Sequence, residues 1–127
     1  RPLSNFFGRE KRQKLDGFIL SGDTLSLARK NVFTEDPERL IRIFRHSQQY
    51  RAQMAPELDS LIVESLPLLT NHIVNSPAAN RSFCSILQAV GEVYPYLNKM
   101  HDLGILQLIL PEFSDLTCLV QDEYYDS

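Results

Sequence analysis

The sequence lacks the features of a secreted or membrane-spanning protein. No apolar run approaches the roughly 18 to 20 residues that cross a bilayer, and residues 1–17 contain no apolar stretch of the kind found in signal peptides. Cysteine is scarce, because Cys84 and Cys118 are the only two, far apart and in no metal-binding spacing. We therefore expect a cytoplasmic protein with reduced thiols, no disulfide and no membrane partner.

The common sequence motifs of catalysis are also missing. There is no Gly-x-Gly-x-x-Gly turn and no phosphate-binding loop ending in Gly-Lys-Ser/Thr, so nothing indicates a dinucleotide or nucleotide site. The chain has no Gly-Ser dipeptide and no Asp-x-Asp pair, with which a nucleotidyltransferase would place its Mg²⁺ ions, and no Gly-x-Ser-x-Gly elbow marks a nucleophile. We predict that the chain contains no catalytic and no cofactor-binding residue.

The dipeptide His101-Asp102 is the feature that most resembles a metal centre, since a His-Asp pair is central to a large family of metal-dependent phosphohydrolases. Such a centre needs several imidazole and carboxylate ligands that converge from different helices and leave a position open for water. The other histidines, His46 and His72, lie on unrelated segments without matching carboxylates. We expect no metal ligand here, and a surface or helix-terminal role for the pair.

Charge is unevenly distributed along the chain. Residues 1–51 carry 11 Lys and Arg against 6 Asp and Glu, and residues 52–127 carry 2 against 10, so the two parts have net charges of +5 and −8. A basic segment can bind nucleic acid, nucleotide phosphates or an acidic surface. The same chain offers an acidic surface, so we expect the two parts to face each other or water, and we expect no nucleic-acid partner.

The residues that are present indicate one small domain. The 127 residues, 43% of them hydrophobic and 23% charged, suffice for a folded unit with its own core. Residues 1–16 are polar and basic, which is typical of a tether. Residues 17–28 alternate apolar and polar positions on both sides of a Ser-Gly-Asp turn. This alternation predicts a β-hairpin, which needs another surface to pack on.

Helical periodicity begins at residue 36. Asp36 is suited to cap a first turn, and Pro37 to occupy its first position, where the missing N–H has no partner to lose. The positions that predict a packed face are Leu40, Ile41, Phe44 and Gln48. The opposite, basic face contains Arg39, Arg42 and Arg45. We interpret this basic face as solvated or ion-paired, with contact to a phosphate or a partner as the alternative.

Further helices follow between prolines and glycines. They are expected over residues 55–66, 68–74, 76–91, 95–104 and 105–110, with a short last helix after Pro111. Ser76 and Pro77 repeat the pattern of cap and first residue, and Gly104 suits a left-handed helix end. The apolar stripe of the third of these helices contains Phe83, Ile86, Leu87 and Val90. We predict a mainly α fold over residues 17–127, a compact array of about five to six helices with a short N-terminal β-hairpin.

Four segments, taken in order, resemble a known family. They are KNVFTEDPERLIRIF (30–44), PELDSLIVESLPLL (56–69), RSFCSIL (81–87) and LNKMHDLGILQLILPEFSDLTCLVQDEYY (97–125). They resemble the central helical region of the bifunctional PII uridylyltransferase and uridylyl-removing enzymes, from about Phe18 to Tyr125, and most specifically from Met100 onward. The neck of the CCA-adding tRNA nucleotidyltransferases contains a helix similar to the Asp36-Pro37 segment and is the alternative parent.

The resemblance implies a multidomain parent enzyme. In this family a nucleotidyltransferase domain uses a divalent metal, Mg or Mn, to transfer UMP from UTP to a tyrosine of a PII signal protein in nitrogen signalling. A following HD domain removes the UMP. The segment that resembles this chain joins those two domains, and the HD metal ligands begin after the position of Tyr125 with a histidine, where this chain has Asp126. His101-Asp102 falls where the family carries no metal ligand.

The resemblance therefore implies a fragment that is not catalytic alone. Its expected partners are the neighbouring nucleotidyltransferase and HD domains and, for the parent, the PII signal protein. A free-standing helical interaction module remains the alternative function, with the apolar residues 105–110 as its binding face.

Overall fold

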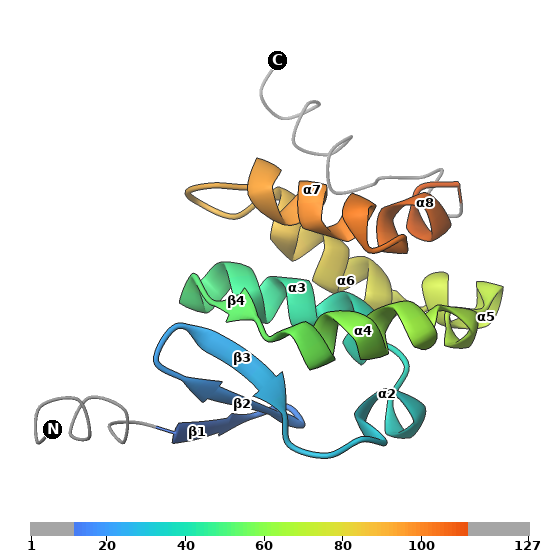
Figure 1. Ribbon diagram of the computed structural model, residues 1–127. Helices are drawn as coiled ribbons and strands as arrows, with labels where there is room; N and C mark the ends of the chain where they lie inside the picture. The colour runs from blue at the N-terminus through green and yellow to red at the C-terminus, as the bar shows by residue number, and fades with distance from the viewer. Residues whose placement is uncertain (1–11, 112–127) are drawn as a thin grey trace, which may run out of the picture.

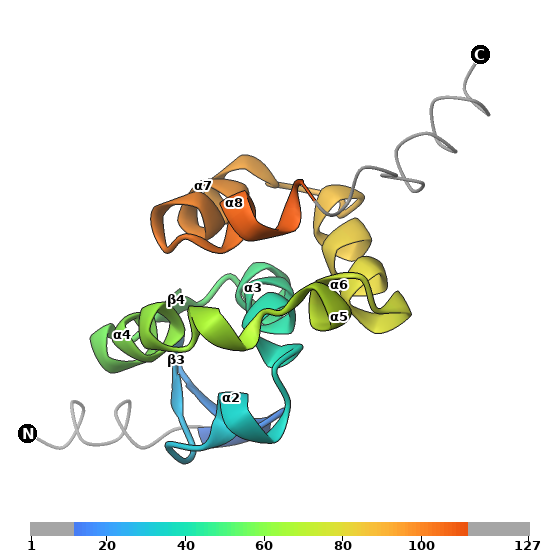
Figure 2. The same cartoon turned by 90° about the vertical axis from the view of Figure 1, so that its right-hand side faces the viewer.

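The computed structural model describes residues 12–111 of the chain as a small sheet covered by helices. Figure 1 shows three tiers: the sheet with α2, then α3 and α4, then α7 and α8. In Figure 2, α6 lies on the side of α3 that is opposite to α4. The elements are β1 (Arg12–Leu15), β2 (Phe18–Ser21), β3 (Thr24–Leu27), α2 (Val32–Glu35), α3 (Arg39–Tyr50), β4 (Gln53–Met54), α4 (Pro56–Glu64), η1 (a 3₁₀ helix, Leu66–Leu68), α5 (Asn71–Val74), α6 (Pro77–Leu87), α7 (Tyr94–Asp102) and α8 (Ile105–Ile109). The predicted mainly α class is confirmed.

The sheet has the order β1-β2-β3-β4, in which the first three strands are antiparallel and β4 runs parallel to β3. The predicted hairpin is confirmed as β2 and β3, joined by a tight turn in which Gly22 has a φ of +63°. Strand β1 was not predicted, because residues 12–15 are mostly exposed and polar and show no apolar alternation. Residues 1–11 lie outside the described part, so the predicted tether is not tested.

One hydrophobic core connects the tiers. The sheet contributes the buried residues Phe18, Leu20 and Leu25, and the Phe18 ring lies 5.7 Å from that of Phe33 in α2. The predicted packed face of α3 is confirmed, since Leu40, Ile41, Phe44 and Gln48 are all buried. Burial of each large apolar side chain contributes about 1.5–3 kcal/mol. The helices therefore supply the surface that the short hairpin needs.

Several predicted helix boundaries are found within two residues, but the short helix α2 precedes the expected start at residue 36. The helix expected over residues 68–74 is only α5, which follows η1. The N-cap of α6 is Ser76, whose Oγ accepts a hydrogen bond from the Ala79 N–H at 3.0 Å. Gly104 has a φ of +90° and separates α7 from α8. Asp36 Oδ1 accepts from the Glu38 N–H at 3.2 Å. However, α3 begins only at Arg39, so Pro37 is not its first residue.

Three expectations need correction or lie beyond the described residues. Val90 was placed in the buried stripe of α6, but this helix ends at Leu87 and Val90 is fully exposed. Cys84 was expected to be a free thiol, but it is disulfide-bonded. The other cysteine, Cys118, and the predicted helix after Pro111 lie outside residues 12–111. None of the helices within that range is both long enough and apolar enough to cross a membrane.

Candidate functional site

Two arginines of the predicted basic face of α3, Arg39 and Arg42, converge on one carboxylate, that of Asp16 in the turn between β1 and β2. Arg42 binds it with both arms of its guanidinium, Nε to Oδ2 at 2.6 Å and Nη2 to Oδ1 at 2.7 Å. Arg39 Nε donates to Oδ1 at 3.2 Å, and His46 Nε2 lies 2.8 Å from Oδ2. These side chains stand on successive turns of the same helix face, so α3 binds the turn between β1 and β2.

The turn is built to present this carboxylate. Asp16 and Gly17 have φ values of +57° and +88°, as in a two-residue type I′ hairpin turn. Asp is among the few residues other than glycine that adopt the left-handed conformation at modest cost. A Cβ atom at Gly17 would lie 2.5 Å from Val32 Cγ2. The turn therefore requires glycine at position 17 and favours Asp or Asn at position 16, and it packs directly against α2.

The cations keep Asp16 ionised. Burial raises the pKa of its carboxyl, but hydrogen bonds from Arg42 and His46, the charge of Arg42 and the bond from Arg39 lower it by more, so the pKa lies well below its usual range. The bidentate Arg42 bond is of the strong, charge-assisted kind. We call Asp16, Arg39, Arg42 and His46 the Asp16 cluster.

The contact with Asp16 shows which nitrogen of the His46 ring carries a proton. Its Nδ1 is buried and has no hydrogen-bond partner within the described part of the chain. An ionised carboxylate only accepts hydrogen bonds, so the contact with Asp16 requires a proton on Nε2. His46 therefore donates from Nε2 to Asp16 Oδ2, which gives the carboxylate a third side-chain donor.

The remaining partners of the basic face are also internal. Arg39 Nη1 donates to the Val32 carbonyl at 2.9 Å and to Glu35 Oε1 at 3.0 Å. Arg42 Nη2 additionally contacts Asp36 Oδ2 at 2.9 Å. Arg45, the third predicted contact residue, donates to Gln48 Oε1 at 3.0 Å. Arg39 and Arg42 are thus part of an ion-pair network. Its acidic members lie within the net positive residues 1–51 and not within the net negative residues 52–127.

Sequence reasoning missed Asp16, although a pattern was available. The dipeptide Asp16-Gly17 favours a type I′ turn, but the prediction placed it between the tether and the hairpin. The contact with Arg42 spans 26 positions, and a charge pattern read along one helix cannot reveal such a partner.

His101 and Asp102 lie at the end of α7, with side chains 62% and 61% exposed. His101 Nδ1 is 3.8 Å from Asp102 Oδ1, within the pair itself. Among residues 12–111, no group of three or more His, Cys, Asp or Glu side chains is arranged to hold a metal ion.

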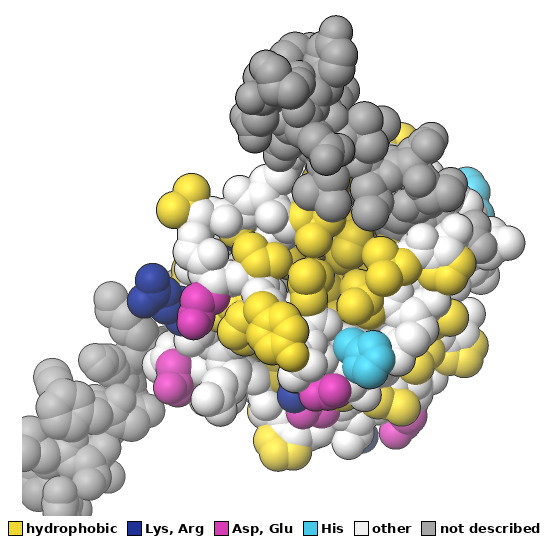
Figure 3. Space-filling model, turned by 90° about the horizontal axis from the view of Figure 1, so that it is seen from above, with side chains coloured by type: hydrophobic (Ala, Val, Ile, Leu, Met, Phe, Trp, Pro, Cys, Tyr) yellow, Lys and Arg dark blue, Asp and Glu magenta, His cyan; other side chains and the backbone are white. Residues whose placement is uncertain are grey.

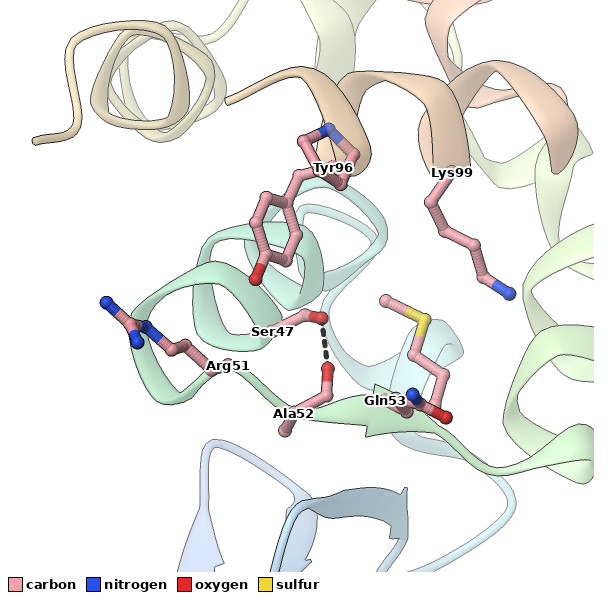
Figure 4. A pocket seen from close by; sticks show the side chains of 8 residues that line it. Ser47, Arg51, Ala52, Gln53, Tyr96 and Lys99 are labelled. Atoms are coloured by element: carbon pink, nitrogen blue, oxygen red, sulfur yellow. Dashed lines mark hydrogen bonds between the residues drawn. The ribbon is translucent and has the colours of Figure 1, made fainter. Parts of the chain in front are cut away.

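A cleft of about 390 Å³ opens between the end of α3, β4 and the start of α7. In Figure 4, Tyr96 points from α7 toward α3, while Arg51 and Lys99 lie at opposite ends. Ser47 Oγ donates to the Ala52 carbonyl at 2.5 Å and closes the floor of the cleft. A second hollow of about 320 Å³ shares Arg51 and Tyr96 with the first and extends along the loop before α7. We call the two together the Arg51 cleft.

Buried Gln48 holds one wall of the Arg51 cleft in place. Its Nε2 donates to the carbonyls of Ile86 and Glu92, both at 3.1 Å. These bonds attach the end of α6 and the loop before α7 to α3. The sequence placed Gln48 on a packed face, but its polar partners 38 and 44 residues away became apparent only in the folded chain.

Apolar side chains gather in the middle of the face that α7 and α8 present (Figure 3). Of the run 105–110, Ile105 and Ile109 are buried, whereas Leu108 and Leu110 are 39% and 44% exposed. Tyr94, at the start of α7, is 74% exposed. We call Tyr94, Leu108 and Leu110 the apolar set of α7 and α8.

Comparison with known proteins gives a consistent result. Residues 18–108 match the family described as the uridylyltransferase GlnD third domain. The bifunctional uridylyltransferase/uridylyl-removing enzyme of Caulobacter vibrioides is 31% identical over 131 aligned positions, covering 100% of this chain and 14% of that protein. The enzyme of the same name from Rhodopseudomonas palustris is 31% identical over 119 positions, covering 94% and 13%. No solved structure matches. The chain thus spans about one seventh of the length of these relatives.

Proposed function

Because the chain belongs to the family of the uridylyltransferase GlnD third domain, we propose that it is a non-catalytic helical scaffold within a larger bifunctional enzyme. In this proposal the parent transfers UMP from UTP to a tyrosine of a PII signal protein and removes it again, in the cytoplasm. The chain holds the neighbouring nucleotidyltransferase and HD domains in a fixed relation. The family match replaces the neck of a CCA-adding enzyme as the parent.

The observation that carries the proposal is the match of residues 18–108 to one domain of much longer enzymes. A single core runs through these residues from β2 to α8. Such continuity suits a rigid spacer, since close-packed interiors resist deformation. The ionic contacts of the basic face within the Asp16 cluster agree with a structural role for α3.

The divalent metal of the parent belongs, in this proposal, to its other domains. Mg²⁺ or Mn²⁺ supplies charge neutralisation and an activated water in phosphoryl-transfer chemistry. Residues 12–111 contain no group of three potential metal ligands. The role of these residues is therefore to position the domains that bind metal and substrate.

The first test separates the chain from its parent. The purified chain, supplied with UTP, a PII signal protein and Mg²⁺ or Mn²⁺, is expected neither to label PII nor to release UMP from labelled PII. The parent polypeptide under the same conditions is expected to do both. Labelling of PII by the chain alone, at a rate that rises in proportion to the chain's concentration, would contradict the proposal.

The second test examines the scaffold role directly. Leu108→Glu with Leu110→Glu places charge in the apolar set of α7 and α8, where both side chains are already partly exposed. In the isolated chain these changes are expected to leave the free energy of unfolding within about 1 kcal/mol of the original. In the parent they are expected to lower both activities several-fold by separating the domains. Asn98→Glu, which adds one negative charge at an exposed position of α7, is the control for each of the two changes made singly.

Self-association is a second candidate function, favoured by the same exposed leucines. Light scattering over a range of concentrations distinguishes the two candidates. The scaffold proposal expects a constant monomer mass. A rise from the monomer mass to the dimer mass as concentration increases, seen in the original chain but not in the Leu108→Glu/Leu110→Glu variant, would favour an interaction module.

A further inference from the structure

The Arg51 cleft lies at an edge of the sheet, where no further strand from residues 12–111 pairs with β4. Strand β4 is the outermost strand on this side. The Gln53 N–H donates to the Asp23 carbonyl at 2.7 Å, and the Ala55 N–H to the Leu25 carbonyl at 2.9 Å. Because peptide groups alternate in direction along a strand, the N–H and C=O of the intervening Met54 point away from β3. Met54 itself lines the cleft.

One cation that lines the cleft has no acidic partner among the residues that the structure describes. Lys99 Nζ is bound to Asp59 Oδ2 at 2.9 Å. Arg51, which lines both hollows of the cleft, forms no ion pair with any residue in 12–111. Glu92 lies on the wall of the second hollow, yet it is not within ion-pair distance of Arg51. A guanidinium in this position is suited to bind a carboxylate with two parallel hydrogen bonds.

The remaining walls suit an extended peptide better than a compact solute. The two hollows adjoin at Arg51 and Tyr96, so the binding surface is longer than either. Tyr96 and Met54 offer apolar and aromatic contact, while the exposed Val90 stands at the far end beside Gly91. Main-chain donors and acceptors at a sheet edge, with side-chain contacts on either side, are the elements of strand addition.

From this arrangement we propose that the Arg51 cleft binds an extended peptide segment carrying an acidic residue, which pairs with the Met54 main chain and places its carboxylate on Arg51. This inference goes beyond the scaffold role and does not depend on the parent's activity. It assigns to the cleft a partner that is recognised by its charge and its extended backbone.

The experiment selects peptides from a random display library on the purified protein. Enriched sequences are expected to contain an acidic residue and to lack proline at the central positions. Fluorescence anisotropy of a labelled, enriched peptide is then measured with variants. Arg51→Gln is expected to weaken binding about tenfold or more, because it removes one partner of a charged pair. Arg81→Gln, at an exposed arginine of α6, is the control and is expected to change binding less than about twofold.

Two further measurements distinguish strand addition from simple charge attraction. Glu92→Gln is expected to tighten binding, since it removes the negative charge nearest the peptide carboxylate on the cleft wall. N-methylation of the peptide amide that pairs with Met54 is expected to abolish binding, whereas methylation one residue away is tolerated. Melting curves establish that Arg51→Gln is folded. Arg and Gln have the same backbone strain in the left-handed conformation of this position, where φ is +52°.

Several outcomes would overturn the proposal. One is a library that yields no acidic consensus. Others are peptides that bind Arg51→Gln as tightly as the original protein, or peptides that are indifferent to N-methylation at every position. Displacement of the peptide by inorganic phosphate or free glutamate at equal concentration would instead identify a small-anion site and would likewise exclude strand addition.

Discussion

The carboxylate of Asp16, in the turn between β1 and β2, accepts both arms of the Arg42 guanidinium from the first turn of α3, at 2.6 and 2.7 Å. This pair connects two elements that the chain builds 26 residues apart. It fixes the orientation of the hairpin on the helix, which apolar contacts alone leave less defined because they are not directional.

Removal of this carboxylate should destabilise the fold. Asp16→Asn keeps the shape and the left-handed tolerance but leaves Arg39 and Arg42 without their shared partner. We expect a loss of about 2 kcal/mol in the free energy of unfolding, measured by urea denaturation at neutral pH. Asp23→Asn, in the exposed turn between β2 and β3, serves as the control and should change stability by less than about 0.5 kcal/mol.

The same carboxylate should make stability depend on pH in the acidic range. The pKa of Asp16 is lowered in the folded chain, so its contribution is present above the ordinary carboxyl pKa of about 4 and is lost as pH falls below it. The stability difference between the original chain and Asp16→Asn should be larger at neutral pH than in acid and should shrink below about pH 4. A difference that grows on acidification would contradict the assignment.

Glu35, whose pKa is lowered to about 2 by hydrogen bonds from Arg29 and Arg39, should add to the acid sensitivity of both proteins.

The two turn glycines should respond differently to alanine. Gly17→Ala forces a Cβ into a φ of +88° and to within 2.5 Å of Val32 Cγ2, whereas Gly22→Ala meets a φ of +63° but no atom within 4 Å. We expect a loss of about 1 kcal/mol for Gly22→Ala from backbone strain alone and about 2–3 kcal/mol for Gly17→Ala. Thermal and urea unfolding measure both. Equal losses would show that the contact with α2 relaxes without cost.

Gln48 should hold in place the loop that borders the Arg51 cleft. Gln48→Ala removes the donor to the Ile86 and Glu92 carbonyls, and we expect a loss of about 2 kcal/mol. Hydrogen exchange should accelerate at residues 88–93, which this side chain attaches to α3. Gln49→Ala, one position along on the exposed side of the same helix, should affect neither quantity. Unchanged exchange in Gln48→Ala would mean that the apolar contacts alone hold the loop.

The His101-Asp102 pair should be dispensable for folding. Both side chains are exposed, so His101→Ala with Asp102→Ala should change the free energy of unfolding by less than about 1 kcal/mol. Addition of EDTA or Mn²⁺ should leave the unfolding midpoint of the original chain unchanged. A midpoint that rises with Mn²⁺ only when the pair is intact would reveal a metal ligand.

Local sequence rules determined much of this molecule. Ser76 with Pro77 defined a helix start, Gly104 defined a helix end, and the spacing of Leu40, Ile41 and Phe44 identified the packed face of α3. These features depend on interactions within one or two turns of chain, so the residue pattern alone contains them. The same local reasoning placed Val90 in a helix that ends three residues earlier, because it did not include the Gln48 contacts that bind the following loop.

Only the tertiary structure decided which groups meet across long sequence separations. The polar strand β1 exists because β2 pairs with it, the arginines of α3 face Asp16 because the hairpin packs beneath them, and the Arg51 cleft arises where α7 crosses the end of α3. Each of these depends on the direction in which whole elements pack. Apolar burial drives that packing but does not specify individual polar contacts, because it is not directional. The sequence pattern therefore determined the helices, and the assembled core determined what their charged faces bind.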